Sequence, residues 1–118
     1  MKYMILIYQG TTPVPGTDAW NELTPEQQGQ VYADYQAVNQ TPGFTAGEGL
    51  DSPETATTVR VQDGRTLTTD GPFAELKEAI GGFAFLEADN LDAAIDLASK
   101  IPAARMGGAV EVRPIKEY

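Results

Sequence analysis

The sequence contains no cysteine and no histidine. The first absence excludes disulfides and thiolate nucleophiles, and the second excludes imidazole bases and histidine-ligated haem or iron. Zinc sites built from these two residue types are excluded as well. No calcium-loop spacing is present, so we expect no metal and no cofactor. Any chemistry must come from carboxylates, tyrosine, lysine, arginine, hydroxyl groups and backbone amides.

Positive charge is scarce in this chain. Eight Lys and Arg stand against 17 Asp and Glu, which gives a formal net charge of −9 at pH 7. An acidic chain repels phosphate backbones, so nucleic acid is not an expected partner. The apolar run at the N-terminus, residues 3–8, is shorter than a signal-peptide core and far shorter than a membrane span. We therefore expect a cytoplasmic protein without a membrane partner.

The composition is that of an ordinary globular protein. Hydrophobic residues make up 42% of the 118 residues and charged residues 21%. This length is sufficient to bury one core but short for two cores of ordinary size. We predict a single domain over residues 1–118.

Two segments have the pattern of buried strands. Lys2–Tyr8 and residues 83–88 are apolar without alternation, which predicts strands covered on both faces. Residues 109–115 alternate Val110 and Val112 against charged neighbours and predict a half-buried edge strand. Residues 9–21 contain two prolines and two glycines and predict a loop.

Two helices are predicted from their end signals. Thr24 as a cap, Pro25 at the first helical position and Gln27 at the capping-box position start the first helix, which Pro42-Gly43 ends. The second covers residues 91–101, with Asp89 or Asn90 as its cap and Pro102 after its last residue.

The middle of the chain predicts a β-hairpin. Residues 56–61 alternate, Asp63-Gly64 is a favoured turn pair, and residues 65–69 form the returning strand. Residues 44–50 are rich in glycine and are left open between a weak strand and irregular structure.

This order of elements is β-α-β-β-α-β with an inserted hairpin arm, which predicts an α+β, ferredoxin-like fold. Its central strands are Lys2–Tyr8 and residues 83–88. Two helices cover only one face of a four-stranded sheet, so the second face needs another cover. A second copy of the chain is the simplest cover, and we expect a homodimer.

One motif carries a family resemblance. Residues 69–78 read Thr-Asp-Gly-Pro-Phe-Ala-Glu-Leu-Lys-Glu and are followed by Gly81-Gly82-Phe83. This stretch resembles the signature of DGPF-type proteins in the YCII-related family, and residues 2–8, 47–50, 56–61, 101–105 and 110–115 support it in order. The resemblance implies a subunit that pairs sheet to sheet as a dimeric α+β barrel, with a cavity between sheet and helices.

The resemblance also implies functions. The broader family includes a dehydrochlorinase that acts on a chlorinated hydroxyquinol, for which a His/Asp catalytic centre is proposed. Because this chain has no histidine, that centre does not carry over. Genes for DGPF-type proteins tend to lie near, or be fused to, those of extracytoplasmic-function sigma factors, which implies a sigma factor as a partner.

Asp70 is the first candidate for a catalytic residue. A carboxylate ahead of Gly-Pro can project from a tight turn into a cavity and, if desolvated, act as a base. The same Asp-Gly-Pro sequence is also turn chemistry, in which the side chain bonds nearby backbone amides.

Four kinds of side chain are candidates for binding. Arg60 and Arg105 can hold an anionic ligand or pair with acidic neighbours on the surface. Glu48, between two glycines, is either a cavity carboxylate or a solvated loop residue. The remaining four candidates are aromatic, and they line either a binding pocket or the ordinary core: Tyr8, Tyr32, Tyr35 and Phe73.

Three functions remain open at this point. The first is a dimer that binds a small organic molecule in a cavity. The second is a cofactor-free lyase or isomerase in which Asp70 takes a proton and Arg60 or Arg105 stabilises the developing anion. The third is an accessory partner of a sigma factor.

Overall fold

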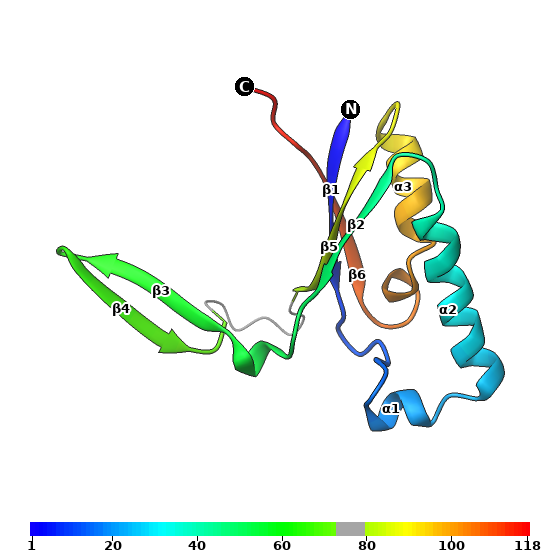
Figure 1. Cartoon of the computed structure of the whole chain (residues 1–118), viewed down its shortest axis with the longest axis horizontal. Helices are drawn as coiled ribbons and strands as arrows, with labels where there is room; N and C mark the ends of the chain where they lie inside the picture. Colours follow the sequence, from blue (N-terminus) through cyan, green and yellow to red (C-terminus); the bar gives the residue numbers. More distant parts are fainter. Residues whose placement is uncertain (73–79) are drawn as a thin grey trace.

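The fold is an α+β body with a projecting hairpin arm, seen in a computed structural model that describes residues 1–72 and 80–118 (Figure 1). The elements follow in chain order: β1 (Lys2–Tyr8), α1 (Asp18–Asn21), α2 (Pro25–Asn39), β2 (Phe44–Gly49), η1 (Pro53–Thr55), β3 (Thr57–Gln62), β4 (Arg65–Asp70), β5 (Ile80–Glu87), α3 (Leu91–Ser99), η2 (Pro102–Ala104) and β6 (Ala109–Pro114).

The body is a four-stranded antiparallel sheet in the order β2-β5-β1-β6. The central strands are β1 and β5, as predicted, and β6 is an edge. Helices α2 and α3 lie on the same face of the sheet (Figure 1). The ferredoxin-like α+β prediction is therefore confirmed.

The core lies between the sheet and these two helices. Tyr3 and Ile5 of β1 are almost fully buried there, and Leu86 and Ala84 are their partners on β5. The helices contribute small and branched side chains: Val31, Val38, Ala94, Leu97 and Ala98. The four strand residues share the helix-facing side because strand side chains alternate between faces.

Both predicted helix starts are confirmed. The Thr24 hydroxyl accepts a hydrogen bond from the Gln27 amide at 3.1 Å, and the Gln27 side chain accepts one from the Thr24 amide at 2.9 Å. Asn90 caps α3 by accepting from the Ala93 amide at 2.9 Å. Helix α3 ends at Ser99, two residues before the predicted end, since Pro102 starts a separate short turn.

One segment differs from the predictions, and a second, which was left open between a weak strand and irregular structure, is a strand. Residues 9–21 were predicted to be a loop, but they contain the one-turn helix α1, which Thr17 caps. Trp20 of this helix is buried and packs edge-on against Tyr32. The open segment 44–50 contains β2, an edge strand of the main sheet. Glycines dominate the local pattern in both segments, with prolines in the first, while packing against the rest of the chain sets the structure.

Strands β1 and β5 are predicted to be covered on both faces. Within the single chain, the face that packs against α2 and α3 is covered and the opposite face is not. Met4 and Leu6 of β1, which point away from the helices, are only partly buried. Phe85 of β5, on the same face, is 41% exposed. No element of residues 1–72 or 80–118 covers this face as α2 and α3 cover the other (Figure 1).

Strands β3 and β4 form the predicted hairpin, which projects from the body as an arm (Figure 1). Asp63 and Gly64 both have positive φ, as a two-residue hairpin turn requires. Three apolar side chains of the arm are exposed: Val59, Val61 and Leu67. With the arm included, the radius of gyration is 16.3 Å, against about 13.5 Å for a compact chain of this length.

Candidate functional site

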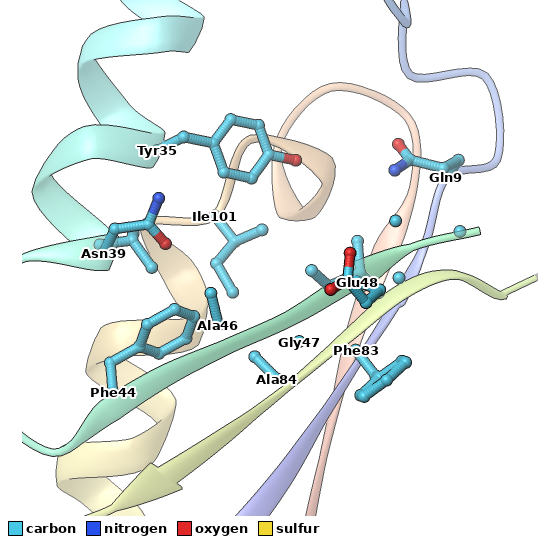
Figure 2. Close-up of a pocket in the computed structure, with 15 residues that line it drawn as sticks. Gln9, Tyr35, Asn39, Phe44, Ala46, Gly47, Glu48, Phe83, Ala84 and Ile101 are labelled. Carbon is cyan, nitrogen blue, oxygen red and sulfur yellow. The ribbon is translucent and has the colours of Figure 1, made fainter. Parts of the chain in front are cut away.

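A cavity of about 250 Å³ lies between α2 and the β2–β5 side of the sheet. Figure 2 shows Tyr35 and Asn39 entering it from α2, with Phe44 and Ala46 below them on β2. Ile101, Val38 and Ala84 supply buried apolar side chains to its lining, which together we call the apolar floor. Gln9 lies at the side nearest the end of β1 (Figure 2).

The cavity exists because the strands beneath it carry very small side chains. Six residues of β2 and β5 in its lining have a methyl group or no side chain at all: Ala46, Gly47, Gly49, Gly81, Gly82 and Ala84. Larger side chains at Ala46, Gly82 and Ala84, which the register places on the helix-facing side, would fill the space against α2. At Gly47 an added Cβ would also lie 2.3 Å from the carbonyl oxygen of Phe83, so glycine allows close approach of the two strands.

An irregularity in the pairing of β2 and β5 sets the position of Glu48. Ala46 pairs with Ala84 and Gly49 with Gly82, so β2 has one more residue than β5 across this interval. Such bulges change the direction of side chains. Figure 2 shows the Glu48 carboxylate on the side of β2 that faces Tyr35 and Gln9.

The side chains of the lining carry a net negative charge. Glu48 is the only Asp, Glu, Lys or Arg among the described residues that line the cavity. Burial raises the pKa of the Tyr35 phenol above its ordinary value of about 10, and the nearby Arg105 opposes this shift. Tyr35 is therefore neutral at pH 7, and Gln9 and Asn39 add neutral amides.

Of the predicted binding residues, the structure brings Glu48 and Tyr35 together at the cavity. Tyr32 packs against Trp20 and is 58% exposed, and Tyr8 is also outside the lining. Phe73 lies outside the described residues.

The two arginines lie elsewhere. Arg105 follows η2 and forms an ion pair with Asp34 of α2. Pairing with an acidic neighbour was the alternative to holding an anionic ligand. Arg60 lies on β3 of the arm. Neither lines the cavity, so the arginines do not form an anion site there.

Asp70 is the last residue of β4 and is exposed at the base of the arm, opposite Thr57. The backbone after it closes that base. The Gly71 amide donates to the Ala56 carbonyl at 2.7 Å, and the Thr58 hydroxyl donates to the Gly71 carbonyl at 2.7 Å. Gly71 has φ +96°, a conformation that favours glycine. Asp70 is not among the residues that line the cavity, and its catalytic role stays a prediction.

Sequence reasoning missed Gln9, Asn39 and Phe44 as lining residues. The available signal was the pair of glycine-rich segments at 47–49 and 81–82, because small residues on neighbouring strands leave a hollow under a helix. The described residues contain no group of three or more metal-ligating side chains that could hold an ion. Within the same residues, no helix is long and apolar enough to cross a membrane.

Comparison with known proteins agrees with this architecture. The family model described as "YCII-related domain" matches residues 1–118. The chain is also 35% identical over 124 residues to a protein of Rhizobium meliloti (strain 1021) named "Uncharacterized protein R00369". That alignment covers 100% of this chain and 94% of the relative. The chain belongs to the YCII-related domain family.

Proposed function

We propose that this protein binds a small organic molecule in the cavity between α2 and the sheet. The observation that carries this proposal is an apolar floor with polar groups at its margin. Ligand sites in proteins typically combine these two features. At about 250 Å³ the cavity is just below the usual range for drug-sized ligands, so a compact molecule is the expected occupant.

Binding is favoured over proton abstraction because the described lining contains no carboxylate pair. Glu48 is the single acidic side chain there, and Asp70 lies at the base of the arm. The hypothesis of a lyase or isomerase that uses Asp70 therefore ranks second. The hypothesis of a sigma-factor partner rests on the family resemblance alone.

The binding proposal is tested by filling the cavity. Ala46→Leu adds bulk inside it, and Ala33→Leu adds the same bulk on the exposed side of α2. Amide spectra recorded with a panel of small aromatic fragments should show shifts clustered around the cavity in the wild type and in Ala33→Leu, but not in Ala46→Leu. Fragment shifts that survive Ala46→Leu, or that cluster elsewhere, would contradict the proposal.

We also propose that a second copy of the chain covers the open face of the sheet. Met4, Leu6, Phe83 and Phe85 share this face by the strand register, and the two phenylalanine rings pack edge-on with centroids 6.2 Å apart. An exposed apolar surface of this kind favours association.

Charge supports a copy of the same chain as the partner. The register places Lys2, Arg113, Glu87 and Glu111 on this face, two of each sign, although the whole chain carries −9. A two-fold interface brings the same surface together with itself, so a balanced face avoids the self-repulsion of an acidic one.

Light scattering tests the dimer. The expected mass is twice the chain mass of 12.7 kDa. Phe85→Lys places charge in the centre of the face and should give monomers, while Val59→Lys, on the exposed arm, should leave the dimer intact. A wild-type monomer at micromolar concentration would contradict this proposal without bearing on ligand binding.

A further inference from the structure

The charge of the cavity lining determines what class of molecule it favours. Glu48 is the one ionised side chain that the described lining contributes at pH 7, since the raised pKa of Tyr35 keeps its phenol neutral. In a chain of net charge −9, an anion entering beside Glu48 meets repulsion from both. A cation meets attraction from both.

The nearest arginine does not reverse this balance. Arg105 lies close enough to Tyr35 to influence its phenol, but its guanidinium is paired with Asp34 and it is not part of the lining. The Asp34 carboxylate offsets part of this charge, and the remainder acts on Tyr35, where burial outweighs it. Arg60 belongs to the arm.

The other lining groups suit a protonated amine. An ammonium group has three donors and no acceptor. The Glu48 carboxylate, the Tyr35 phenol oxygen and the amide oxygen of Gln9 are acceptors that Figure 2 places around one side of the cavity. Phe44 and the ring of Tyr35 offer aromatic surface, which attracts cations through the ring face.

The apolar floor specifies the rest of the molecule. Val38, Ala84 and Ile101 are buried and present only hydrocarbon to the cavity. A ligand with a compact apolar body and one charged end would place the body on this floor and the charge beside Glu48. Small amphipathic amines have this shape.

We propose that the cavity selects a small organic cation, a protonated amine on a compact apolar or aromatic body, with Glu48 as the residue that recognises its charge. This inference rests on the proposed binding function and adds the charge of the ligand. Glu48 is itself exposed, so water screens the interaction and the preference over an equally shaped anion should be on the order of tenfold.

Three single-ring probes of similar size test the charge preference: benzylamine, benzyl alcohol and benzoate. Their dissociation constants are measured by amide chemical-shift titration at neutral pH and low salt. Protonated benzylamine should bind about tenfold more tightly than benzoate, with benzyl alcohol between them. High salt should reduce the difference, because it screens partly exposed charges.

Two variants assign the preference to Glu48. Glu48→Gln keeps the side-chain size and should lower benzylamine affinity by roughly tenfold, while benzyl alcohol affinity changes little. Glu117→Gln removes the same charge from the exposed C-terminal segment and should leave all three affinities as in the wild type. Amide spectra of Glu48→Gln should retain the wild-type dispersion, since the residue is exposed.

Each outcome decides between the two proposals. Equal binding of benzylamine and benzoate, or an unchanged preference in Glu48→Gln, would overturn the charge assignment and leave cavity binding intact. No shift of cavity amides by any of the three probes would overturn both.

Discussion

Arg105 and Asp34 form an ion pair that ties the turn after α3 to α2, next to Tyr35. Two opposing effects meet at the Tyr35 phenol. Burial disfavours the charged phenolate and raises the pKa, and the positive charge of Arg105 lowers it. Burial is the larger effect, so the net pKa is raised.

Replacing Arg105 should raise the Tyr35 pKa further. Arg105→Gln removes the cation that favours the phenolate and leaves the burial unchanged. The pKa is measured by ultraviolet phenolate absorption, as the difference between each protein and its Tyr35→Phe partner. Arg65→Gln, which removes the same charge from the arm, should leave the Tyr35 titration in place. A Tyr35 pKa that falls in Arg105→Gln would show that the arginine acts by shielding the phenol from water.

The raised pKa predicts a loss of stability in alkali. Because the folded state holds the Tyr35 proton more tightly than the unfolded state, this contribution is complete below about pH 10 and is lost as the pH rises through the folded pKa. Tyr35→Phe cannot ionise. Its free energy of unfolding, measured by urea denaturation, should gain on the wild type above about pH 10. Tyr118→Phe, which removes a fully exposed phenol, should follow the wild type across the same range.

Substitution of Gly43 by alanine should lower the stability of the protein more than the same substitution of Gly16, a glycine of similar backbone conformation. The φ of Gly43 is +85°, and an added Cβ would lie 2.4 Å from the Glu87 carbonyl oxygen on β5. Gly16 has φ +91° and no atom within 4 Å of an added Cβ. Gly16→Ala should cost about 1–2 kcal/mol from the backbone conformation alone. Gly43→Ala should cost at least about 1 kcal/mol more, from crowding against a strand. Equal losses by thermal denaturation would show that β5 shifts freely at this point.

The parts of the fold that the sequence predicted are those encoded by neighbouring residues. The capping box at Thr24 and the Asp63-Gly64 turn depend on residues within a few positions of one another. Strand β2 is different, because its glycine-rich sequence has weak strand preference and its pairing with β5 holds it in place. That pairing joins residues far apart in the chain.

The site shows the same division. Glu48 between two glycines was visible in the sequence as a candidate, because local flexibility and a carboxylate are local features. The pairing of Arg105 with Asp34 spans 71 positions, and no pattern in either segment indicates it. Gln9 and Asn39 entered the lining because a loop and a helix end meet over the small residues of β2 and β5, which only the packed structure defines.

Asp70 provides the final prediction, because its turn and catalytic interpretations give different results in one substitution. Asp70→Asn keeps the size and one acceptor oxygen and removes the charge. If Asp70 serves the turn at the base of the arm, the change should cost under about 1 kcal/mol, and benzylamine binding at the cavity should be unchanged. Asp63→Asn at the other end of the arm is the matched control, since asparagine also adopts the positive φ found there. A loss of roughly a hundredfold or more in any turnover, with folding intact, would instead identify Asp70 as a base and restore the lyase or isomerase hypothesis. We expect the first result, because the structure places Asp70 on the exposed base of the arm and outside the cavity lining.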